Sequence, residues 1–210
     1  MRITKIEIQK NRSNYFNLYT EEDTFLFSIT EETLLHFGLQ KDQDLSNSKL
    51  QEIIHHDTCM RCVYQALRYL SRRPHLQNEL KLKLRRKQFS ENIIDQTIEY
   101  LQNKNYLDDL SFITSFIDEQ IQLRKSGPQL IRKKLFEKGA PAQVVDRMIE
   151  EIYPENQQFN NALLLFDKKR KHLTGLNQEK LKEKMFRFLQ QKGYPWVVIE
   201  RVFNDHLSAE

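Results

Sequence analysis

Residues 80–98, LKLKLRRKQFSENIIDQTI, decide the fold because their pattern occurs three times in the chain. The pattern recurs 51 residues later as IRKKLFEKGAPAQVVDRMI in residues 131–149, and 54 residues after that as MFRFLQQKGYPWVVIERVF in residues 185–203. In each copy two apolar stripes keep the same offsets on either side of a short joint. A fixed period of about 50 residues is typical of an array of small repeated units.

Each copy predicts three helices. In the first, Leu80 and Leu84 share one face of a middle helix, while Ile94, Ile98 and Leu101 form a stripe at i, i+4 and i+7 on a third helix. Two amphipathic helices cannot enclose a core alone, so we expect a first helix to supply the remaining wall. The apolar residues of these first helices are Val63, Leu67 and Leu70, then Phe112, Phe116, Ile117 and Ile121, then Phe159, Leu163 and Phe166.

Glycine and proline are scarce, with 5 of each in 210 residues. Average proteins contain roughly 12% of the two together, so long regular elements are expected here, and a β-sandwich or barrel is disfavoured. Gly139 and Gly193 follow the middle helices, where a left-handed residue ends a helix well. Pro128 is expected to start a middle helix, and Pro141 and Pro195 to be the first residues of the third helices.

The first 45 residues follow a different pattern. Apolar and polar residues alternate around Ile6 and again over residues 25–29, which is the period of a strand. Polar residues 11–14 and 20–23 are turn candidates, and Thr30 is a candidate cap for a short helix. We therefore predict a mainly α protein: a small N-terminal β-meander plus helix (1–45), followed by a tandem array of three three-helix repeats (46–104, 105–154 and 155–210).

Charge is distributed unevenly along the chain, although the net charge is only +4. Residues 1–57 carry 6 basic and 10 acidic side chains, whereas residues 58–104 carry 10 and 4. Residues 105–154 carry 7 and 8, and residues 155–210 carry 10 and 7. An acidic head before basic repeats indicates a polyanion or an acidic partner for part of the surface.

Several cations and one aromatic residue are candidates for that contact. Solvated helix faces and cations at helix C-termini are the simpler interpretation, but they do not account for the excess of basic residues in the first repeat. We therefore favour contact with an anion. The candidate residues for binding a partner or DNA are Arg72, Arg73, Lys81, Arg85, Arg86, Arg124, Lys125, Arg132, Lys133, Lys134, Lys168, Lys169, Arg170, Lys171 and Trp196.

Trp196 is the single tryptophan, and the other two copies have Glu91 and Ala142 at its position. A position that accepts glutamate is unlike a core position. Trp196 is therefore either a surface anchor for a partner or a residue that packs near Phe203 or His206.

Catalytic and metal-binding patterns are weak. His55, Cys59 and Cys62 share one helix face at i, i+4 and i+7, but a fourth zinc ligand is missing and buried helical cysteines are common. Asp108 and Asp109 precede a helix, where capping explains them. The chain has no Gly-rich phosphate loop, no G-x-S-x-G and no H-E-x-x-H. We expect no metal, no cofactor and no enzymatic activity, with a metal-dependent redox protein as an alternative.

Membrane and export signals are also weak. No apolar run approaches the ~20 residues needed to cross a bilayer, and residues 1–10 lack the apolar region of a secretory signal. Two cysteines cannot form a disulfide scaffold. We expect a cytoplasmic monomer with no membrane partner.

Two long motifs resemble the RecX family of recombinase regulators. The first is YQALRYLSRRPH at residues 64–75, followed by Glu79-Leu80 and Lys83-Leu84. The second is YLDD at residues 106–109, followed by Phe112 and by RKSG at residues 124–127. The resemblance covers roughly residues 57–207, and the head resembles the extension that many members carry. The chain departs from the family pattern at Gln88, where glycine is usual, and at Leu76 and Gln77, where serine is common.

The resemblance implies a negative modulator of the RecA recombinase. Such a protein binds the groove of the RecA filament on single-stranded DNA and suppresses ATP hydrolysis, strand exchange and filament growth. Expected partners are the RecA filament and single-stranded DNA, with double-stranded DNA as a further candidate. An array of basic three-helix units suits an acidic groove or phosphates. The alternative is a stand-alone DNA-binding protein of tandem helix-turn-helix-like bundles.

The basic middle helix of the first repeat allows a test from sequence alone. Arg85 and Arg86 lie outside the face that contains Leu80 and Leu84. The double change Arg85→Glu, Arg86→Glu is therefore expected to weaken binding to the filament or to DNA without unfolding the protein. A binding isotherm measured alongside circular dichroism checks this, and an unchanged isotherm would contradict it.

Overall fold

A computed structural model describes residues 1–21, 24–173 and 178–207. For residues 206 and 207 it describes the backbone only. The chain forms two compact units, Met1–Leu107 and Asp108–Glu210. The first contains the sheet and the helices of the first repeat, and the second contains the helices of the other two repeats. The fold is thus mainly helical with a small antiparallel sheet at the N-terminus, as predicted. The finer boundaries after residues 45, 104 and 154 stay predictions.

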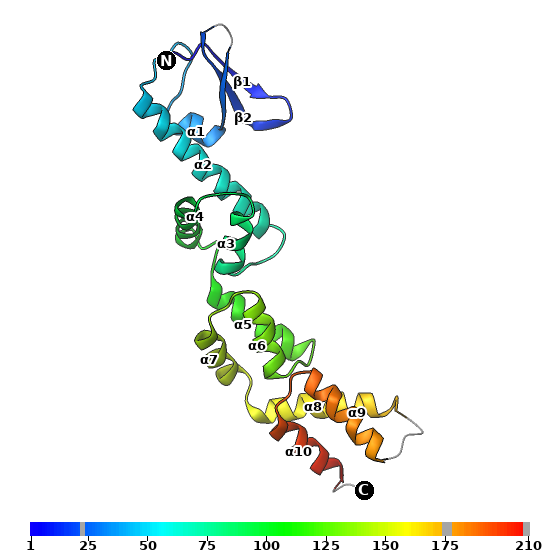
Figure 1. The fold of residues 1–210 in the computed structure, drawn as a ribbon. Coiled ribbons are helices and arrows are strands. Elements are labelled where there is room, and N and C mark those ends of the chain that lie inside the picture. The colour runs from blue at the N-terminus through cyan, green and yellow to red at the C-terminus, as the bar shows by residue number, and fades with distance from the viewer. Residues whose placement is uncertain (22–23, 174–177, 208–210) are drawn as a thin grey trace. The chain divides into compact units, whose positions relative to one another are not determined.

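The N-terminal sheet is a meander of β1 (Lys5–Gln9), β2 (Arg12–Tyr19) and β3 (Phe25–Thr30), all antiparallel (Figure 1). The turn expected at residues 11–14 is shorter than predicted. Gln9 pairs with Arg12, so only Lys10 and Asn11 form the turn and β2 begins at once. The turn expected at residues 20–23 falls partly outside the described residues; the flanking Thr20 N–H donates to the Thr24 carbonyl at 2.9 Å.

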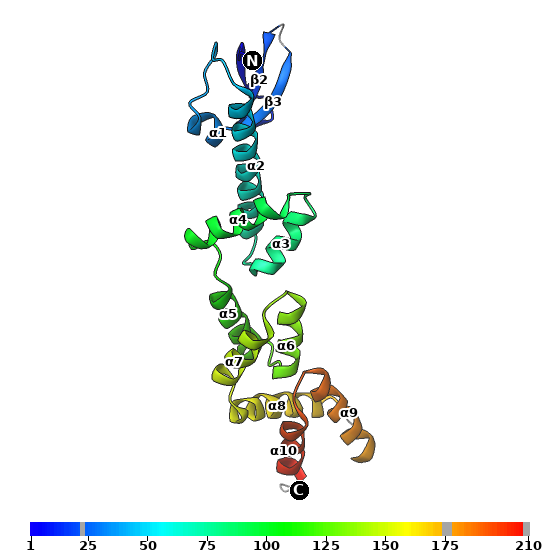
Figure 2. The ribbon, with the colours of Figure 1, turned by 60° about the vertical axis from the view of Figure 1, so that its left-hand side comes forward.

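Two helices follow the sheet. The short helix α1 (Glu31–His36) begins where predicted, with the Thr30 hydroxyl accepting from the Thr33 N–H. Helix α2 (Asn47–Leu70) has 24 residues and is about 36 Å long, and Ser46 caps it. Its first half contributes Ile53 to the core beneath the sheet, and its second half contributes Cys62 and Ala66 to the first bundle. Figure 2 shows α2 running from the sheet to α3 and α4. One helix thus serves two cores.

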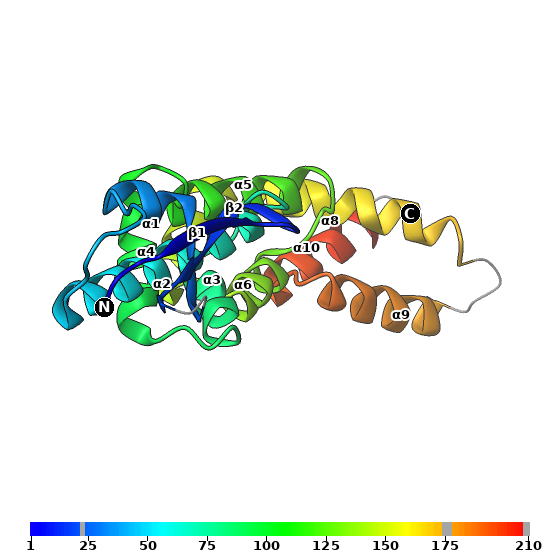
Figure 3. The same cartoon turned by 90° about the horizontal axis from the view of Figure 1, so that it is seen from above.

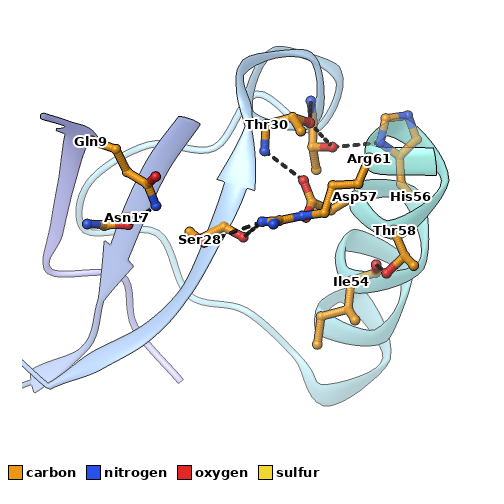
Figure 4. A network of polar contacts seen from close by, with 10 residues as sticks. Gln9, Asn17, Ser28, Thr30, Ile54, His56, Asp57, Thr58 and Arg61 are labelled. Atoms are coloured by element: carbon orange, nitrogen blue, oxygen red, sulfur yellow. Dashed lines mark hydrogen bonds and ion pairs between the residues drawn. The ribbon is translucent and has the colours of Figure 1, made fainter. Parts of the chain in front are cut away.

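A buried ion pair holds the sheet on α2 (Figure 4). Asp57 is 6% exposed, and its carboxylate accepts from the Thr30 N–H at 2.6 Å and from Arg61 Nε at 2.5 Å. The Arg61 guanidinium also donates to the Ser28 carbonyl at 2.5 Å. A buried carboxylate is tolerated only when its oxygens are satisfied, and the bonds from Thr30 and Arg61 satisfy one oxygen each. The contacts fix the end of β3 to the middle of α2.

The first bundle adds α3 (Gln77–Arg85) and α4 (Glu91–Asn103) to α2. Its core contains the predicted stripes, with Leu80, Leu84, Ile94 and Leu101 fully buried. Gln88, which stands where the other repeats have glycine, has a φ of 65° and so takes the left-handed conformation itself. Such a conformation costs a non-glycine residue roughly 1–2 kcal/mol, which the packing of the two helices must offset.

The second bundle consists of α5 (Asp109–Gln122), α6 (Pro128–Glu137) and α7 (Ala142–Ile152). Asp108 caps α5 by accepting from the Ser111 N–H at 3.1 Å. Pro128 is the first residue of α6, as expected, and Gly139 ends that helix region with a φ of 83°. Helix α7 begins one residue later than predicted, so Pro141 is its N-cap and not its first residue. The backbone of Pro141 is extended, and its carbonyl accepts from the Val145 N–H.

The third bundle consists of α8 (Glu155–Arg170), α9 (Gln178–Gln191) and α10 (Trp196–Leu207), which pack on one another (Figure 3). The expected wall residues Phe159, Leu163 and Phe166 of α8 all contribute to its core. Pro195 again precedes its helix rather than starting it, and its carbonyl accepts from the Ile199 N–H at 3.1 Å.

A close backbone contact joins the second and third bundles. The Gly127 N–H donates to the Lys192 carbonyl at 2.7 Å, and the Gln129 N–H donates to the Gly193 carbonyl at 3.0 Å. A Cβ atom at Gly127 would lie 2.4 Å from the carbonyl carbon of Gly193, so no larger residue fits. The buried Tyr194 hydroxyl donates to the Lys125 carbonyl at 2.7 Å across the same contact. These contacts bind the two bundles into one unit.

The close contact predicts that Gly127→Ala destabilises the C-terminal unit by about 1–3 kcal/mol, because the new methyl group overpacks against backbone. Gly127 has an ordinary φ of −76°, so backbone strain contributes nothing to this effect. Gly38→Ala is the comparison, since that site is open but has a φ of 54°. Chemical denaturation checks the prediction, and an unchanged midpoint for Gly127→Ala would contradict it.

Candidate partner-binding surfaces

Five of the candidate cations are engaged within their own bundles. Each contacts a side chain of the same repeat, four of them a carboxylate and one an amide. The engaged residues are Arg73 with Glu79, Lys81 with Asp95, Arg85 with Glu91, Arg132 with Asp146, and Lys134 with Gln120. Their charges stabilise the repeats before any partner arrives.

One type of ion pair recurs in the first two repeats. Lys81 Nζ lies 2.6 Å from Asp95 Oδ1, and Arg132 Nε lies 2.6 Å from Asp146 Oδ1. The two pairs occupy the same positions 51 residues apart and join the middle helix to the third helix in each case. Both cations are partly shielded by their bundles. We assign them a role in holding the helices together.

Arg85 is also paired: its guanidinium donates twice to the Glu91 carboxylate, at 2.6 and 2.7 Å. Arg85→Glu would place two carboxylates beside each other and weaken the contact between α3 and α4. Arg86, which follows it, is exposed and has no such contact among the described side chains. Arg86 is therefore the better residue for testing partner binding alone.

Five candidate cations are exposed and have no ion-pair partner within the described parts of the chain: Arg72, Arg86, Lys133, Lys168 and Lys171. Lys87, which lies beside Arg86 but is outside the candidate set, has the same status. Arg124 is nearly as available, since it is 67% exposed and its nearest carboxylate, that of Glu119, is 3.9 Å away. A cation of this kind can meet a phosphate or carboxylate without losing an internal partner. Each repeat presents at least one.

The remaining candidates have local roles. Lys168, Lys169 and Arg170 form the last turn of α8 and Lys171 caps it, so all four also stabilise the negative end of that helix. Lys169 Nζ lies 5.5 Å above the Phe188 ring. Lys125 takes a φ of 50°, and its carbonyl receives the Tyr194 hydroxyl. The placement of cations at a helix C-terminus therefore explains part of the basic cluster at residues 168–171.

Trp196 is 61% exposed and makes an edge contact with Phe186, with ring centroids 5.2 Å apart. Both rings line a pocket of about 450 Å³ between α9 and α10, and Phe203 lines it too. The side chain of His206, the other expected neighbour, lies outside the described residues. Sequence reasoning missed Phe186. The signal was present, because Phe186 occupies the repeat position of Lys81 and Arg132.

The two thiols do not converge on a shared site. Cys62 is fully buried in the first core, and burial raises its pKa to about 11. Burial also raises the pKa of Cys59, which contacts Gln96 Oε1 at 3.3 Å and lies 3.8 Å from His55 Nε2. Across the described residues no group of three histidine, cysteine, aspartate or glutamate side chains could hold a metal ion. Both thiols are protonated at neutral pH, which disfavours redox chemistry.

The loop between α2 and α3, which contains Arg72 and Arg73, also contains a buried histidine. His75 is 4% exposed; its Nδ1 donates to the Arg73 carbonyl at 2.8 Å, and its Nε2 accepts from Lys83 Nζ at 2.7 Å. Burial, followed by the charges of Arg73 and Lys83, lowers the pKa of His75 below its ordinary value of 6.5. The ring therefore stays neutral and ties the loop to α3.

These features define a class: a protein of tandem three-helix domains with a strand-rich head and exposed cations on each repeat. No helix in the described ranges is long and apolar enough to cross a bilayer. Family models match residues 1–46 (regulatory protein RecX, N-terminal domain), 62–101 (RecX, first three-helix domain) and 155–203 (RecX, third three-helix domain). The chain belongs to the RecX family of regulatory proteins.

Relatives agree with this assignment, and solved structures agree with the fold. The regulatory protein RecX of Bacillus mycoides (strain KBAB4) is 30% identical over 201 residues, which is 94% of this chain and 74% of the relative. That of Bacillus cytotoxicus is 29% identical over the same shares. A crystal structure of regulatory protein RecX has a TM-score of 0.75 at 24% identity and covers 97% of this chain and 98% of its own. RecX from Lactobacillus salivarius has a TM-score of 0.66 at 21% identity and covers 71% and 97%.

The low pKa of His75 predicts acid sensitivity of the first bundle. The pKa of His75 in the folded protein lies below the unfolded value of 6.5. The stability that neutral His75 contributes is therefore complete above pH 6.5 and is lost as the pH falls through the folded pKa. The free energy of unfolding should fall by up to about 1.4 kcal/mol per pH unit for this proton. Burial also lowers the pKa of His56, so that residue adds a slope of the same sign.

Denaturant unfolding of the wild type and of His75→Gln at pH 7 and pH 5 separates the two histidines. His75→Gln should be less stable at pH 7 but lose less stability on acidification. Equal losses in the two proteins would contradict the assignment to His75.

Proposed function

We propose that this protein regulates the RecA recombinase by binding the RecA filament on single-stranded DNA. It inhibits ATP hydrolysis, strand exchange and filament extension, and so modulates recombination and DNA repair. Membership of the RecX family supports RecA as the partner. The observation that carries the proposal is the set of exposed cations without internal partners in every repeat.

The spacing of these cations suits an extended polyanionic partner. Arg72 precedes α3 and Arg86 follows it, so they lie at opposite ends of a nine-residue helix about 14 Å long. Lys133 lies on the second repeat, and Lys168 and Lys171 on the third. Cations that are distributed over three repeats offer several separate contacts. They can follow a groove or a strand that runs past several repeats, since each cation contributes a separate screened contact.

The acidic head is unsuited to the same contact. Residues 1–57 have four more acidic than basic side chains, so phosphates meet net repulsion there. We propose that the helical repeats carry the binding surface. The protein acts by binding rather than by catalysis, as a monomer in the cytoplasm where RecA filaments form.

A second candidate function is binding to DNA without RecA, because exposed lysine and arginine side chains suit phosphates equally well. Salt dependence separates the two. Binding driven by phosphates alone weakens with salt at a log–log slope near −0.7 per contact on single strands. Weak, salt-abolished binding to naked DNA beside tight binding to the filament favours the regulator.

The RecA ATPase test requires a matched pair of variants. The wild type should inhibit DNA-dependent ATP hydrolysis by RecA at about stoichiometric amounts. Arg72→Glu with Arg86→Glu should raise the inhibitory concentration roughly tenfold, which corresponds to ~1.4 kcal/mol, because two unpaired cations become repulsive. Lys10→Glu with Lys41→Glu changes the net charge equally on exposed residues of the head and should leave inhibition almost unchanged.

Two results would contradict the proposal. Absence of inhibition by the wild type would remove RecA inhibition as the function. Equal loss in both double variants, with circular dichroism unchanged, would show that net charge acts and that the first repeat is not the contact surface.

A further inference from the structure

The third repeat lacks an internal cation that the other two possess. Lys81 pairs with Asp95 in the first repeat, and Arg132 pairs with Asp146 in the second. The same positions in the third repeat are Phe186 and Glu200. The acid is retained while the cation is replaced by an aromatic ring. Glu200 is exposed and has no ion-pair partner among the described side chains.

A second ion pair of the first repeat is also replaced by uncharged residues in the third. In the first repeat Glu91 receives both hydrogen bonds of Arg85. The third repeat has Trp196 at the position of Glu91 and Gln190 at the position of Arg85. Two ion-pair positions of the first repeat thus become Phe186 and Trp196, which contact each other edge to face.

The result is an aromatic pocket of about 450 Å³ with an acidic rim. Its volume lies in the range of roughly 300–1,000 Å³ typical of binding pockets. Ile199 is buried beneath it, and Phe203 packs edge to face on Phe166, so the floor of the pocket is part of the third core. The charged residues of the lining are Glu179, Lys182, Glu183 and Glu200.

The charge of the rim is partly compensated, but not at Glu200. Glu183 pairs with Arg187 at 2.5 Å, one turn further along α9. Lys182 Nζ lies 5.9 Å above the Phe203 ring. Glu200 therefore presents a carboxylate in the same pocket as the aromatic rings, and no described side chain forms an ion pair with it. This combination attracts a cation and repels a phosphate.

We infer that this pocket, defined by Phe186, Trp196, Phe203 and Glu200, binds an arginine side chain of a partner protein, within a segment whose flanking residues are apolar. The guanidinium plane stacks against Trp196 or Phe186 and donates hydrogen bonds to Glu200, taking the place that Arg132 holds in the second repeat. Arginine suits the site better than lysine, because its planar group both stacks on rings and binds a carboxylate in two-pronged fashion.

The inference does not depend on the proposed function. The exposed cations meet an acidic partner or phosphates, whereas this pocket meets a basic segment. A protein whose surface offers both charges would engage both sites. The pocket can be tested without RecA or DNA, so the failure of one proposal leaves the other standing.

The single tryptophan makes the pocket directly observable in the full-length protein. The probe is the peptide acetyl-Leu-Arg-Leu-amide, titrated to millimolar concentration while Trp196 fluorescence is recorded. The matched peptide contains citrulline, which keeps the shape of arginine but carries no charge. A saturable change with the arginine peptide, at least tenfold weaker with the citrulline peptide, is expected.

Two variants place the binding at this pocket. Phe186→Arg restores the internal pair of the other repeats, so its side chain should fill the site and abolish peptide binding while the protein stays folded. Glu200→Gln should weaken binding about tenfold or more. Glu151→Gln, on the exposed part of α7, is the matched control and should have no effect.

Several outcomes would overturn the inference. They are no saturable response to the arginine peptide, equal responses to both peptides, or unchanged binding in Glu200→Gln. A Trp196 signal that changes with protein concentration alone would indicate a second copy of this chain as the occupant. A saturable Trp196 response to oligothymidylate would indicate nucleic acid instead. Either result would show that the pocket binds something other than an arginine side chain of a partner protein.

Discussion

The architecture depends on the burial of the apolar stripes of short helices against a third wall. Helices as short as α3, with nine residues, are marginal in water and become stable only when their apolar faces are covered. Leu80 and Leu84 are fully buried because α2 and α4 enclose them, and Ile131 and Leu135 are equally buried in the second bundle. The same requirement explains the length of α2, which supplies a wall to the first bundle and also covers the core beneath the sheet. Removing a first helix would leave each pair of amphipathic helices without a core.

Once the cores are closed, the charged positions around them divide into two groups. Cations at the contact between middle and third helices find carboxylates of the same bundle, as Lys81 and Arg132 do. Cations at helix ends, such as Arg72 and Arg86, point to solvent without partners in the described chain. The first group contributes to the stability of the repeats, and the second is available to a partner. The third repeat differs, because its helix contact carries Phe186 and Trp196 in place of ion pairs. Repeats of one fold thus present different chemistry from equivalent positions.

Much of the fold was predictable because helical periodicity is a local property. The spacing of Leu80, Leu84, Ile94 and Ile98 indicates two amphipathic helices without any knowledge of their neighbours. The left-handed residue at Gln88 was predictable from its alignment with Gly139 and Gly193. Turn and cap positions were less accurate. The first turn of the sheet is only two residues long, and Pro141 and Pro195 are caps, because strand pairing and carbonyl hydrogen bonds decide these boundaries. The candidate surface was the least predictable part, since nothing local tells a paired arginine from a free one.

The sequence by itself determined the three-helix repeats, the strand-rich head and the family, because periodicity and motif spacing are written along the chain. Only the tertiary structure decided which cations are free and where the aromatic pocket lies. Arg85 and Arg86 are adjacent in sequence, yet one is held by Glu91 and the other is not. Glu200 has no such partner among the described side chains, because Phe186 stands on the facing helix at the position of Lys81 and Arg132. Ion pairs and pockets depend on distances between helices, which form only when the apolar stripes have packed.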